Sequence, residues 1–307
     1  MIVIAHLSDL HLDGGVRAEE RARAVLDHLE GLPFELAALL VTGDVADHGL
    51  PAEYEQARRL LVSRHPVLVG PGNHDERAAF RTVLLGQAGP AGSADAAGPA
   101  GSADAAGPAG SADAAGPAGS ADAAGPAGSA DAAGPAGPVN QVHRGDGFVL
   151  ALCDSSVPGR DHGLLDDRTL AWLEEEVAAT PAGVPVLVAF HHPPAALHEP
   201  FIDGIRQFGE ERLAELARRR PSIAGFLCGH AHTPAATTFA GRPLLVAPGV
   251  TSTLRLPWER RAHREDVVHL DLPPALAFHV LSADGRLTTH FRTVPVRPTP
   301  GGFTKPV

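Results

Sequence analysis

The chain has 307 residues, of which 44% are hydrophobic, and its formal charge is −11. It has no run of basic residues that could follow a phosphate backbone, so nucleic acid is not expected as a partner. No apolar run approaches the ~20 residues needed to span a bilayer, and Cys153 and Cys228 lack the spacing of a zinc or redox motif, which favours reduced, buried thiols.

The first residues read as the start of a folded domain. The apolar, β-branched run IVIAHL at residues 2–7 predicts a buried strand. It is not preceded by the charged segment of a secretory signal peptide, nor followed by a small-residue cleavage site. We therefore expect a cytoplasmic protein.

Apolar runs then alternate with segments of helical spacing. Further strands are expected at residues 36–44, 66–70, 147–154, 184–190 and 222–229. Helices are expected at residues 18–30, 51–62, 76–85, 166–178 and 204–219. From about residue 236 short alternating segments predict antiparallel strands. This order of strands and helices indicates a layered α/β fold.

A low-complexity segment interrupts this pattern. The unit AGPAGSADA repeats five times from Ala88 to Ala132, and a truncated copy extends the repeat to residue 137. The repeat has no hydrophobic periodicity and cannot bury enough apolar surface to offset its ordering entropy, so a disordered surface insertion is expected. The sequence therefore predicts one domain formed by residues 1–87 and 138–300, the insertion at 88–137, and a tail at 301–307.

Five short polar segments each follow an apolar run that is expected to be a strand. They are SDLH at 8–11, GD at 43–44, GNHD at 72–75, HHPP at 191–194 and GHAH at 229–232. Because ligands of open α/β sheets bind at the carboxyl ends of strands, these segments are expected to converge. Carboxylates, an amide oxygen and imidazoles suit Mn²⁺, Fe²⁺/Fe³⁺, Zn²⁺ or Co²⁺, and they are too many for one tetrahedral zinc.

The ordered set of segments resembles that of the calcineurin-like metallophosphoesterases, and is most similar to their class III 3′,5′-cyclic-nucleotide (cAMP) phosphodiesterases. The likeness rests on SDLHL at 8–12, GPGNHD at 70–75, CDSSVPG at 153–159, FHHPP at 190–194 and CGHAH at 228–232. It covers nearly the whole chain apart from the repeat. The resemblance implies a four-layer α/β/β/α sandwich with two mixed β-sheets.

The resemblance also implies the residues of the site. It assigns seven ligands to two divalent metal ions: Asp9, His11 and His232 to one, Asn73, His191 and His230 to the other, and Asp44 to both. A hydroxide between the metals is expected to attack a phosphodiester, most directly cyclic AMP, to give the 5′-monophosphate. His74 is expected to face the substrate phosphate, as hydrogen-bond donor or general acid. Asp75 is expected to orient a neighbouring group.

Several residues keep two interpretations. His192 competes with its neighbour His191 as metal ligand and is otherwise expected near the substrate. His162, in the segment VPGRDHG, is either a substrate contact or a solvated loop histidine. Asp47 is expected to support a ligand or a turn rather than to bind metal.

The overall function also has alternatives. The second-ranked function, after a cyclic-nucleotide phosphodiesterase, is a broad phosphodiesterase such as a glycerophosphodiesterase. A phosphomonoesterase ranks third. A non-catalytic scaffold is disfavoured because all seven positions carry residues able to bind metal. The expected partner is a small phosphodiester, and the resemblance is compatible with a homodimer.

Overall fold

Two β-sheets form the centre of the protein. The computed structural model describes residues 1–87, 137–260 and 267–296. The first sheet has the strand order β15 (Leu287–Thr293), β14 (Ala275–Leu281), β1 (Ile2–Leu7), β2 (Ala38–Thr42) and β3 (Val67–Gly70). The second has the order β10 (Ala235–Phe239), β11 (Arg242–Val246), β9 (Ile223–Cys228), β7 (Val186–Ala189), β5 (Phe148–Leu152) and β4 (Gln141–Gly145). Two short pairs, β6 (Gly163–Leu164) with β8 (Gln207–Phe208) and β12 (Thr253–Leu254) with β13 (Val268–His269), lie outside these sheets.

Both large sheets are mixed. In the first sheet β1, β2 and β3 are parallel, and β14 and β15 extend it in antiparallel pairing. In the second sheet β5, β7, β9 and β11 are parallel, with antiparallel β4 and β10 at the two edges. The parallel strands therefore end at a common edge in each sheet, and that edge is where the polar segments emerge.

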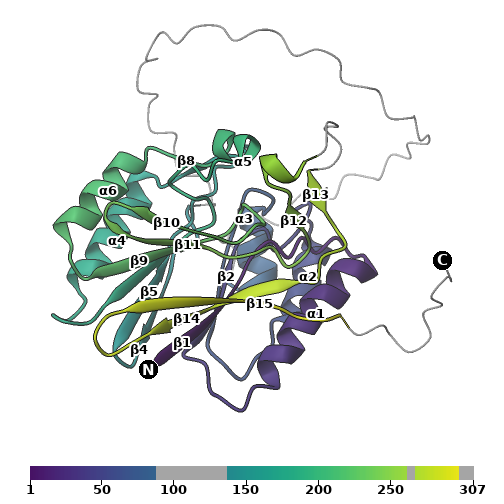
Figure 1. Cartoon of the computed structure of the whole chain (residues 1–307), viewed down its shortest axis with the longest axis horizontal. Helices are drawn as coiled ribbons and strands as arrows, with labels where there is room; N and C mark the ends of the chain where they lie inside the picture. Colours follow the sequence, from purple (N-terminus) through teal and green to yellow (C-terminus); the bar gives the residue numbers. More distant parts are fainter. Residues whose placement is uncertain (88–136, 261–266, 297–307) are drawn as a thin grey trace, which may run out of the picture.

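Helices cover the outer faces of the two sheets (Figure 1). The first half of the chain contributes α1 (Val16–Glu30), α2 (Pro51–Leu60), the short α3 (Arg77–Ala79) and the π-helical turn η1 (Phe80–Leu84). The second half contributes α4 (Asp167–Ala178), α5 (Pro200–Gly204), α6 (Glu210–Arg219) and the 3₁₀ turn η2 (Pro257–Glu259). In Figure 1 α1 and α2 lie beside the first sheet, and α4 and α6 beside the second.

Three apolar clusters separate the layers. One packs α1 and α2 on the first sheet, for example Val25 and Tyr54 against Leu39. Another packs α4 and α6 on the second sheet. The third lies between the sheets and contains Ile4 and Leu150 from facing strands. The predicted four-layer α/β/β/α sandwich is thus confirmed.

One prediction about the second half of the chain was wrong. A single helix was expected at residues 204–219, but α5 ends at Gly204, β8 follows, and α6 begins after Gly209, whose φ is +67°. The final segments were expected to be antiparallel strands, and they pair in this way in β10–β11, β12–β13 and β14–β15, although β11 also pairs in parallel with β9. The broken helix and the parallel pairing both arise from contacts between distant segments, which local hydrophobic spacing does not encode.

The cysteines, the helices and the repeat can be compared with the remaining predictions. Cys153 and Cys228 are buried and unpaired, as expected. None of the helices in the described parts of the chain combines the length and apolarity needed to cross a membrane. The repeat, apart from Gly137, and the tail at 301–307 lie outside the described residues, so the predicted disorder and domain limits stay predictions.

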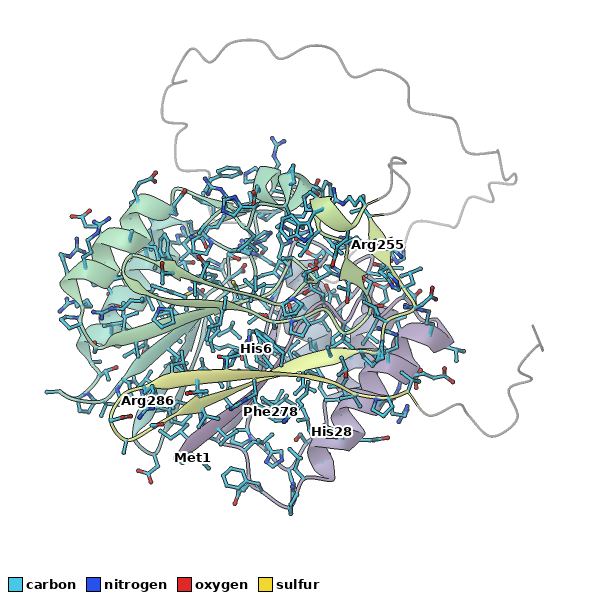
Figure 2. The ribbon with its side chains drawn as sticks, viewed as in Figure 1. Met1, His6, His28, Arg255, Phe278 and Arg286 are labelled. Carbon is cyan, nitrogen blue, oxygen red and sulfur yellow. The ribbon has the colours of Figure 1, made fainter. Side chains whose placement is uncertain are left out.

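A polar row crosses the first sheet on the face that meets the second. His6 Nε2 lies 2.8 Å from Thr42 Oγ1, and His6 Nδ1 lies 2.9 Å from His279 Nε2. His279 Nδ1 in turn lies 2.8 Å from Thr289 Oγ1. Figure 2 places His6 toward the middle of the molecule, with Met1 and Arg286 at its periphery. Every ring nitrogen of the pair has a partner while both imidazoles are neutral.

Burial keeps this histidine pair neutral. It lowers the pKa of His279 to about 3, and burial together with the neighbouring His279 lowers the pKa of His6 well below its ordinary value. Below pH 6.5 the unfolded chain therefore takes up protons that the folded chain refuses. The free energy of unfolding is therefore not reduced by this pair above pH 6.5, and it falls as the pH drops from 6.5 toward 3.

We expect His279→Gln to reduce the acid sensitivity of folding. Lowering the pH from 7.5 to 5 should reduce the free energy of unfolding by about 2 kcal/mol for one such buried neutral histidine, because one pKa unit corresponds to about 1.4 kcal/mol. Urea unfolding at both pH values measures the difference. His290→Gln, on the adjacent strand β15 and exposed, is the control. An unchanged pH dependence in His279→Gln relative to that control would show that the pair does not limit acid stability.

Candidate metal centre

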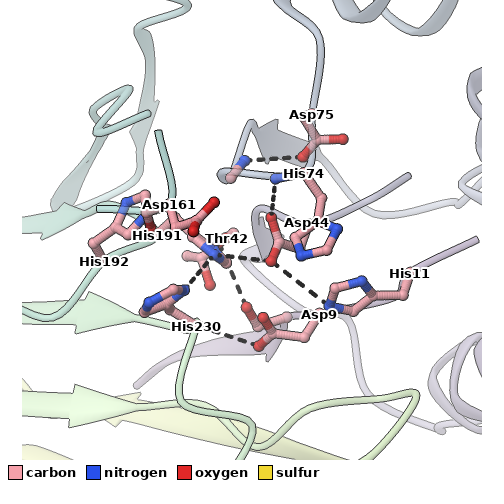
Figure 3. Close-up of polar contacts among 12 residues, drawn as sticks. Asp9, His11, Thr42, Asp44, His74, Asp75, Asp161, His191, His192 and His230 are labelled. Carbon is pink, nitrogen blue, oxygen red and sulfur yellow. Dashed lines mark hydrogen bonds and ion pairs between the residues drawn. The ribbon is translucent and has the colours of Figure 1, made fainter. Parts of the chain in front are cut away.

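The five polar segments converge where the parallel strands of both sheets end. Asp9 and His11 follow β1, Asp44 follows β2, and Asn73 and His74 follow β3. The second sheet contributes a further set from β7 and β9, namely His191, His192, His230 and His232. Figure 3 shows side chains from the two sheets pointing toward one another, among them Asp9, Asp44 and His230. The convergence predicted from strand ends is present in the structure.

The ligand-type atoms fall into overlapping groups. Each group has one possible ligand atom from each of three residues, all within 4.8 Å of one another. The groups are Asp9, His11 and His232; His11, Asp44 and His74; Asp9, Asp44 and His191; and His191, His192 and His230. Because the groups share members, they form one continuous cluster rather than separate sites. Asp9, His11, Asp44 and His191 each belong to two of the groups and so form the middle of the cluster.

The backbone at the cluster is unusual. Outside glycine, seven described residues have φ between +41° and +67°, and five of them are predicted ligands. These five are Asp9, His11, Asp44, His230 and His232. Such left-handed conformations cost about 1–3 kcal/mol each and persist where surrounding structure over-determines them, often at functional sites.

Two glycines let the ligand loops approach closely. A Cβ at Gly43, where φ is +98°, would lie 2.6 Å from His191 Nδ1 and 2.7 Å from Gly72 N. A Cβ at Gly72 would lie 2.2 Å from Asp44 Oδ1. The motifs GD and GNHD therefore need glycine because one loop sits directly on the next.

Three histidines have an outer ring nitrogen held by a hydrogen bond. His191 Nδ1 donates to the carbonyl of Thr42 over 2.6 Å. His11 Nδ1 lies 2.9 Å from Asp47 Oδ1, and His232 Nδ1 lies 2.7 Å from Ser252 Oγ. A proton on the outer nitrogen leaves Nε2 with a lone pair that faces the cluster, which is the form that binds metal.

The inner ring nitrogens lie close to one another and to a carboxylate. His11 Nε2 lies 3.2 Å from His232 Nε2, and His191 Nε2 lies 3.2 Å from His230 Nδ1. Asp44 Oδ2 lies 3.2 Å from His191 Nε2 and 3.6 Å from His11 Nε2. Each such contact needs a proton or a cation between its two atoms, so the arrangement suits cations placed among these atoms.

Three buried side-chain atoms of the predicted ligands have no hydrogen-bond partner. They are Asp9 Oδ1, Asn73 Oδ1 and His230 Nε2. A buried polar atom without a partner costs about 1–3 kcal/mol and usually indicates a missing water or ion. All three belong to predicted metal ligands, so the donor set fits divalent metal ions.

The electrostatics of the cluster couple carboxylates to histidines. Burial raises the pKa of Asp44, but the neighbouring His191 and His11 outweigh it and hold the pKa well below its ordinary range. Burial lowers the pKa of His191, yet the charges of Asp44 and Asp9 raise it to about 9. The pKa values of His230 and His232 are lowered, chiefly by burial. The site therefore holds an ionised Asp44 beside a protonated His191, and binding of a cation at this nitrogen would release the proton.

His74 lies at the opening of the cluster. Its backbone N–H donates to Asp44 Oδ1 over 2.9 Å, and its Nδ1 donates to the carbonyl of Asp47 over 2.8 Å. The side chain is 42% exposed, so Nε2 is the nitrogen available to a substrate.

Asp75 holds two of the ligand loops together. Its carboxylate accepts from the backbone N–H groups of Val45, Ala46 and Gly72, and from the hydroxyl of Tyr54. Burial and the charge of Asp44 raise its pKa to about 6. It thus connects the GD loop to the GNHD loop.

His192 and His162, which each had two interpretations, occupy different places. His192 is fully buried, and both its ring nitrogens are engaged, Nδ1 with Ser155 Oγ at 2.9 Å and Nε2 with the carbonyl of Asp161 at 3.1 Å. His162 is partly buried, and its ring lies edge-on to Phe208 with centroids 5.6 Å apart.

Some supporting residues were not predicted. Thr42 and Ser252 contact the histidines but belong to no recognisable motif, and Ser155 lies in the CDSSVPG segment without having been given a role. Ser252 is 20 residues from His232, and Thr42 is 149 residues from His191. Only the three-dimensional fold reveals them. Asp47, expected to support a ligand or a turn, accepts from His11.

Comparisons with known proteins agree with this geometry. Residues 2–114 match the family described as calcineurin-like phosphoesterase. A probable cyclic nucleotide phosphodiesterase of Rhodococcus erythropolis is 30% identical over 261 residues, covering 81% of this chain and 71% of the relative. Glycerophosphodiester phosphodiesterase GpdQ of Enterobacter lignolyticus is 27% identical over 289 residues, covering 91% and 86%.

Solved structures support the same fold. A dimetal phosphatase from Danio rerio superposes with a TM-score of 0.58 at 13% identity, covering 95% of this chain and 96% of that protein. At this identity the likeness establishes the fold alone. Fold, site geometry and sequence similarity together show that the chain belongs to the calcineurin-like phosphoesterases, a family of metal-dependent phosphoric ester hydrolases.

Proposed function

We propose that the clustered residues hold two divalent metal ions and that the site hydrolyses a 3′,5′-cyclic nucleotide to the 5′-monophosphate. The seven proposed ligands are Asp9, His11, Asp44, Asn73, His191, His230 and His232. His74 is the proposed catalytic side chain. The observation that carries the proposal is the set of buried ligand atoms without hydrogen-bond partners, from both sheets, in one cluster.

Hydrogen bonding favours His191 over His192 as a ligand. His191 uses Nδ1 for the Thr42 carbonyl and keeps Nε2 beside Asp44. His192 has both nitrogens occupied by other partners. A histidine whose second nitrogen is fixed by a carbonyl presents the other in the correct tautomer for metal.

The chain's own residues then position the substrate. Bound metal ions supply a Lewis acid that neutralises the phosphodiester and activates water. With Nδ1 donating to the Asp47 carbonyl, a protonated His74 donates from Nε2 toward a phosphoryl oxygen, where charge develops. From the same nitrogen it can pass a proton to the leaving alkoxide.

Similarity supports the substrate class and provides one rival. The Rhodococcus relative is named a probable cyclic nucleotide phosphodiesterase, and CpdA of Escherichia coli, 26% identical over 295 residues, a 3′,5′-cyclic adenosine monophosphate phosphodiesterase. The Enterobacter relative is named a glycerophosphodiester phosphodiesterase. Glycerophosphodiesters are therefore the second candidate. Manganese or iron as native metal, a cytoplasmic location and a homodimer are further parts of the proposal.

We expect cyclic AMP hydrolysis with added Mn²⁺, and its loss in Asp44→Ala. Removing a group that organises transition-state charge costs about 10²–10³ in kcat. The matched control is Asp27→Ala, which changes an exposed aspartate on α1. Turnover of cyclic AMP, a glycerophosphodiester and 4-nitrophenyl phosphate on one preparation ranks the substrates. Faster turnover of either rival would move the assignment to that substrate, and turnover unaffected by Asp44→Ala would refute the site.

We expect Mn²⁺ to raise the unfolding temperature of the chelator-treated protein. A ligand that binds only the folded state adds about 2.7 kcal/mol at a hundred times its Kd, and each kcal/mol shifts Tm by about 2–4 °C in a domain of this size. His232→Ala should bind fewer metal ions and show a smaller shift. His143→Ala, on β4 away from the cluster, should match the wild type. Equal shifts in all three proteins would place the metal elsewhere.

We expect the repeat to be dispensable for hydrolysis. The described residues that flank it lie together, because Arg81 Nη2 donates to the carbonyl of Pro138 over 2.7 Å and Gln87 N donates to the carbonyl of Arg81 over 2.9 Å. Replacing residues 88–136 by a short glycine–serine linker should change only the entropic cost of loop closure, which falls by about 0.6 kcal/mol for each halving of the loop length. Kinetics on the shortened protein check this. Lost activity in a folded variant would give the repeat a functional role.

A further inference from the structure

A loop between β5 and β6 forms one wall of a cavity beside His74. The cavity has a volume of about 260 Å³ and is lined by residues 72–77 on one side and 156–159 on the other. The first side carries Asn73 and His74, so the cavity adjoins the candidate metal centre. The other side is part of residues 155–163, called here the wall loop. Whatever fixes the wall loop therefore fixes the shape of this cavity.

The base of the wall loop is closed by backbone hydrogen bonds. Leu164 N donates to the carbonyl of Ser155 over 3.0 Å, and Gly163 N donates to the carbonyl of Arg206 over 3.2 Å. Near its tip, Arg160 N donates to the carbonyl of Val157 over 2.9 Å, which makes a tight turn. Residues 158–161 are exposed. The exposed half of the loop thus needs a contact to the rest of the protein to have a fixed position.

His192 provides such a contact. A carbonyl only accepts, so His192 Nε2 donates to the carbonyl of Asp161 over 3.1 Å. Nδ1 is then the acceptor, and it receives the hydroxyl proton of Ser155 over 2.9 Å. Ser155 Oγ accepts in turn from the backbone N–H of His192 over 3.2 Å. One imidazole therefore joins both ends of the wall loop. Figure 3 shows Asp161 beside His192.

The fit around the ring is close. A Cβ at Gly163 would lie 2.4 Å from His192 Cγ, so only glycine lets the loop return over the imidazole. On its other side the ring lies 4.8 Å from His191 and 4.6 Å from His230, measured between centroids. His192 is thus packed between the metal-binding histidines and the wall loop.

We propose that His192 is a positioning residue that holds the wall loop against the metal centre and so fixes the cavity that receives the alcohol portion of the phosphodiester. The proposal rests on the proposed function. His192 acts through the Asp161 carbonyl and Ser155 and touches neither metal nor substrate. Its chemistry predicts which replacement preserves the role. Glutamine places an amide N–H where Nε2 stands, whereas asparagine reaches only the place of Nδ1.

The kinetic test compares His192→Gln with His192→Asn on two synthetic esters. Bis(4-nitrophenyl) phosphate has a second alcohol group that the cavity must receive, and 4-nitrophenyl phosphate lacks it. We expect His192→Asn to raise KM for the diester about tenfold, equivalent to about 1.4 kcal/mol of binding, with a much smaller change for the monoester. His192→Gln should stay near the wild-type KM ratio. His290→Gln is the control for a histidine outside the site.

A second readout does not depend on hydrolysis. Arg160 lies in the exposed part of the wall loop, so trypsin cleaves after it when the loop opens. Mass spectrometry of the fragment ending at Arg160 measures the rate. We expect faster cleavage in His192→Asn than in the wild type and His192→Gln, with the same bound Mn²⁺ in all three proteins.

Several outcomes would overturn the proposal. Equal cleavage rates and equal KM ratios in the two variants would show that His192 does not anchor the loop. Loss of Mn²⁺ in both variants would make His192 a metal ligand instead. If the wild type bound Mn²⁺ but hydrolysed neither ester, the proposed function would fail, and the cleavage rates would still decide whether His192 holds the loop.

Discussion

The whole arrangement depends on keeping buried carboxylates and imidazoles together where two sheets end. Asp9 and Asp44 are almost fully buried, and both sit in left-handed backbone conformations that cost about 1–3 kcal/mol each. Nearby contacts do not offset these conformational costs, because buried ligand atoms without hydrogen-bond partners add to them. The close-packed core between and outside the sheets stabilises the edge from which the ligand loops emerge. In the proposed function, bound cations would supply the remaining compensation, which would tie metal binding to folding stability.

The orientation of the histidines follows one rule throughout the site. Each proposed imidazole ligand that has an outer partner is fixed by a group of neutral or negative character: a carbonyl for His191, a carboxylate for His11 and a hydroxyl for His232. The outer partner selects the tautomer, and the inner nitrogen then faces the cluster. Since these partners come from different elements, the rigidity of the sandwich is transmitted directly to the ligand geometry.

The sequence predicted the layers and the converging segments because both have local signals. Continuous apolar runs mark buried parallel strands, and ligand residues directly after them mark their carboxyl ends. It could not predict that residues 204–219 break at β8, because β8 exists only through pairing with β6, more than forty residues earlier. Nor could it identify Thr42 or Ser252, whose types are common and whose partners are distant in the chain.

His191 and His192 are adjacent in the chain but have different contacts. They have the same side chain and follow the same strand, yet one ring faces Asp44 and the other faces the wall loop. The chain bends at these residues, and the two rings lie nearly at right angles with centroids 4.8 Å apart, so each ring meets a different set of partners. In the proposed function the inner layer would recognise phosphate through metal ions, whatever the alcohol. Selection among phosphodiesters would then fall to the outer layer, where the wall loop and its anchor set the shape of the cavity.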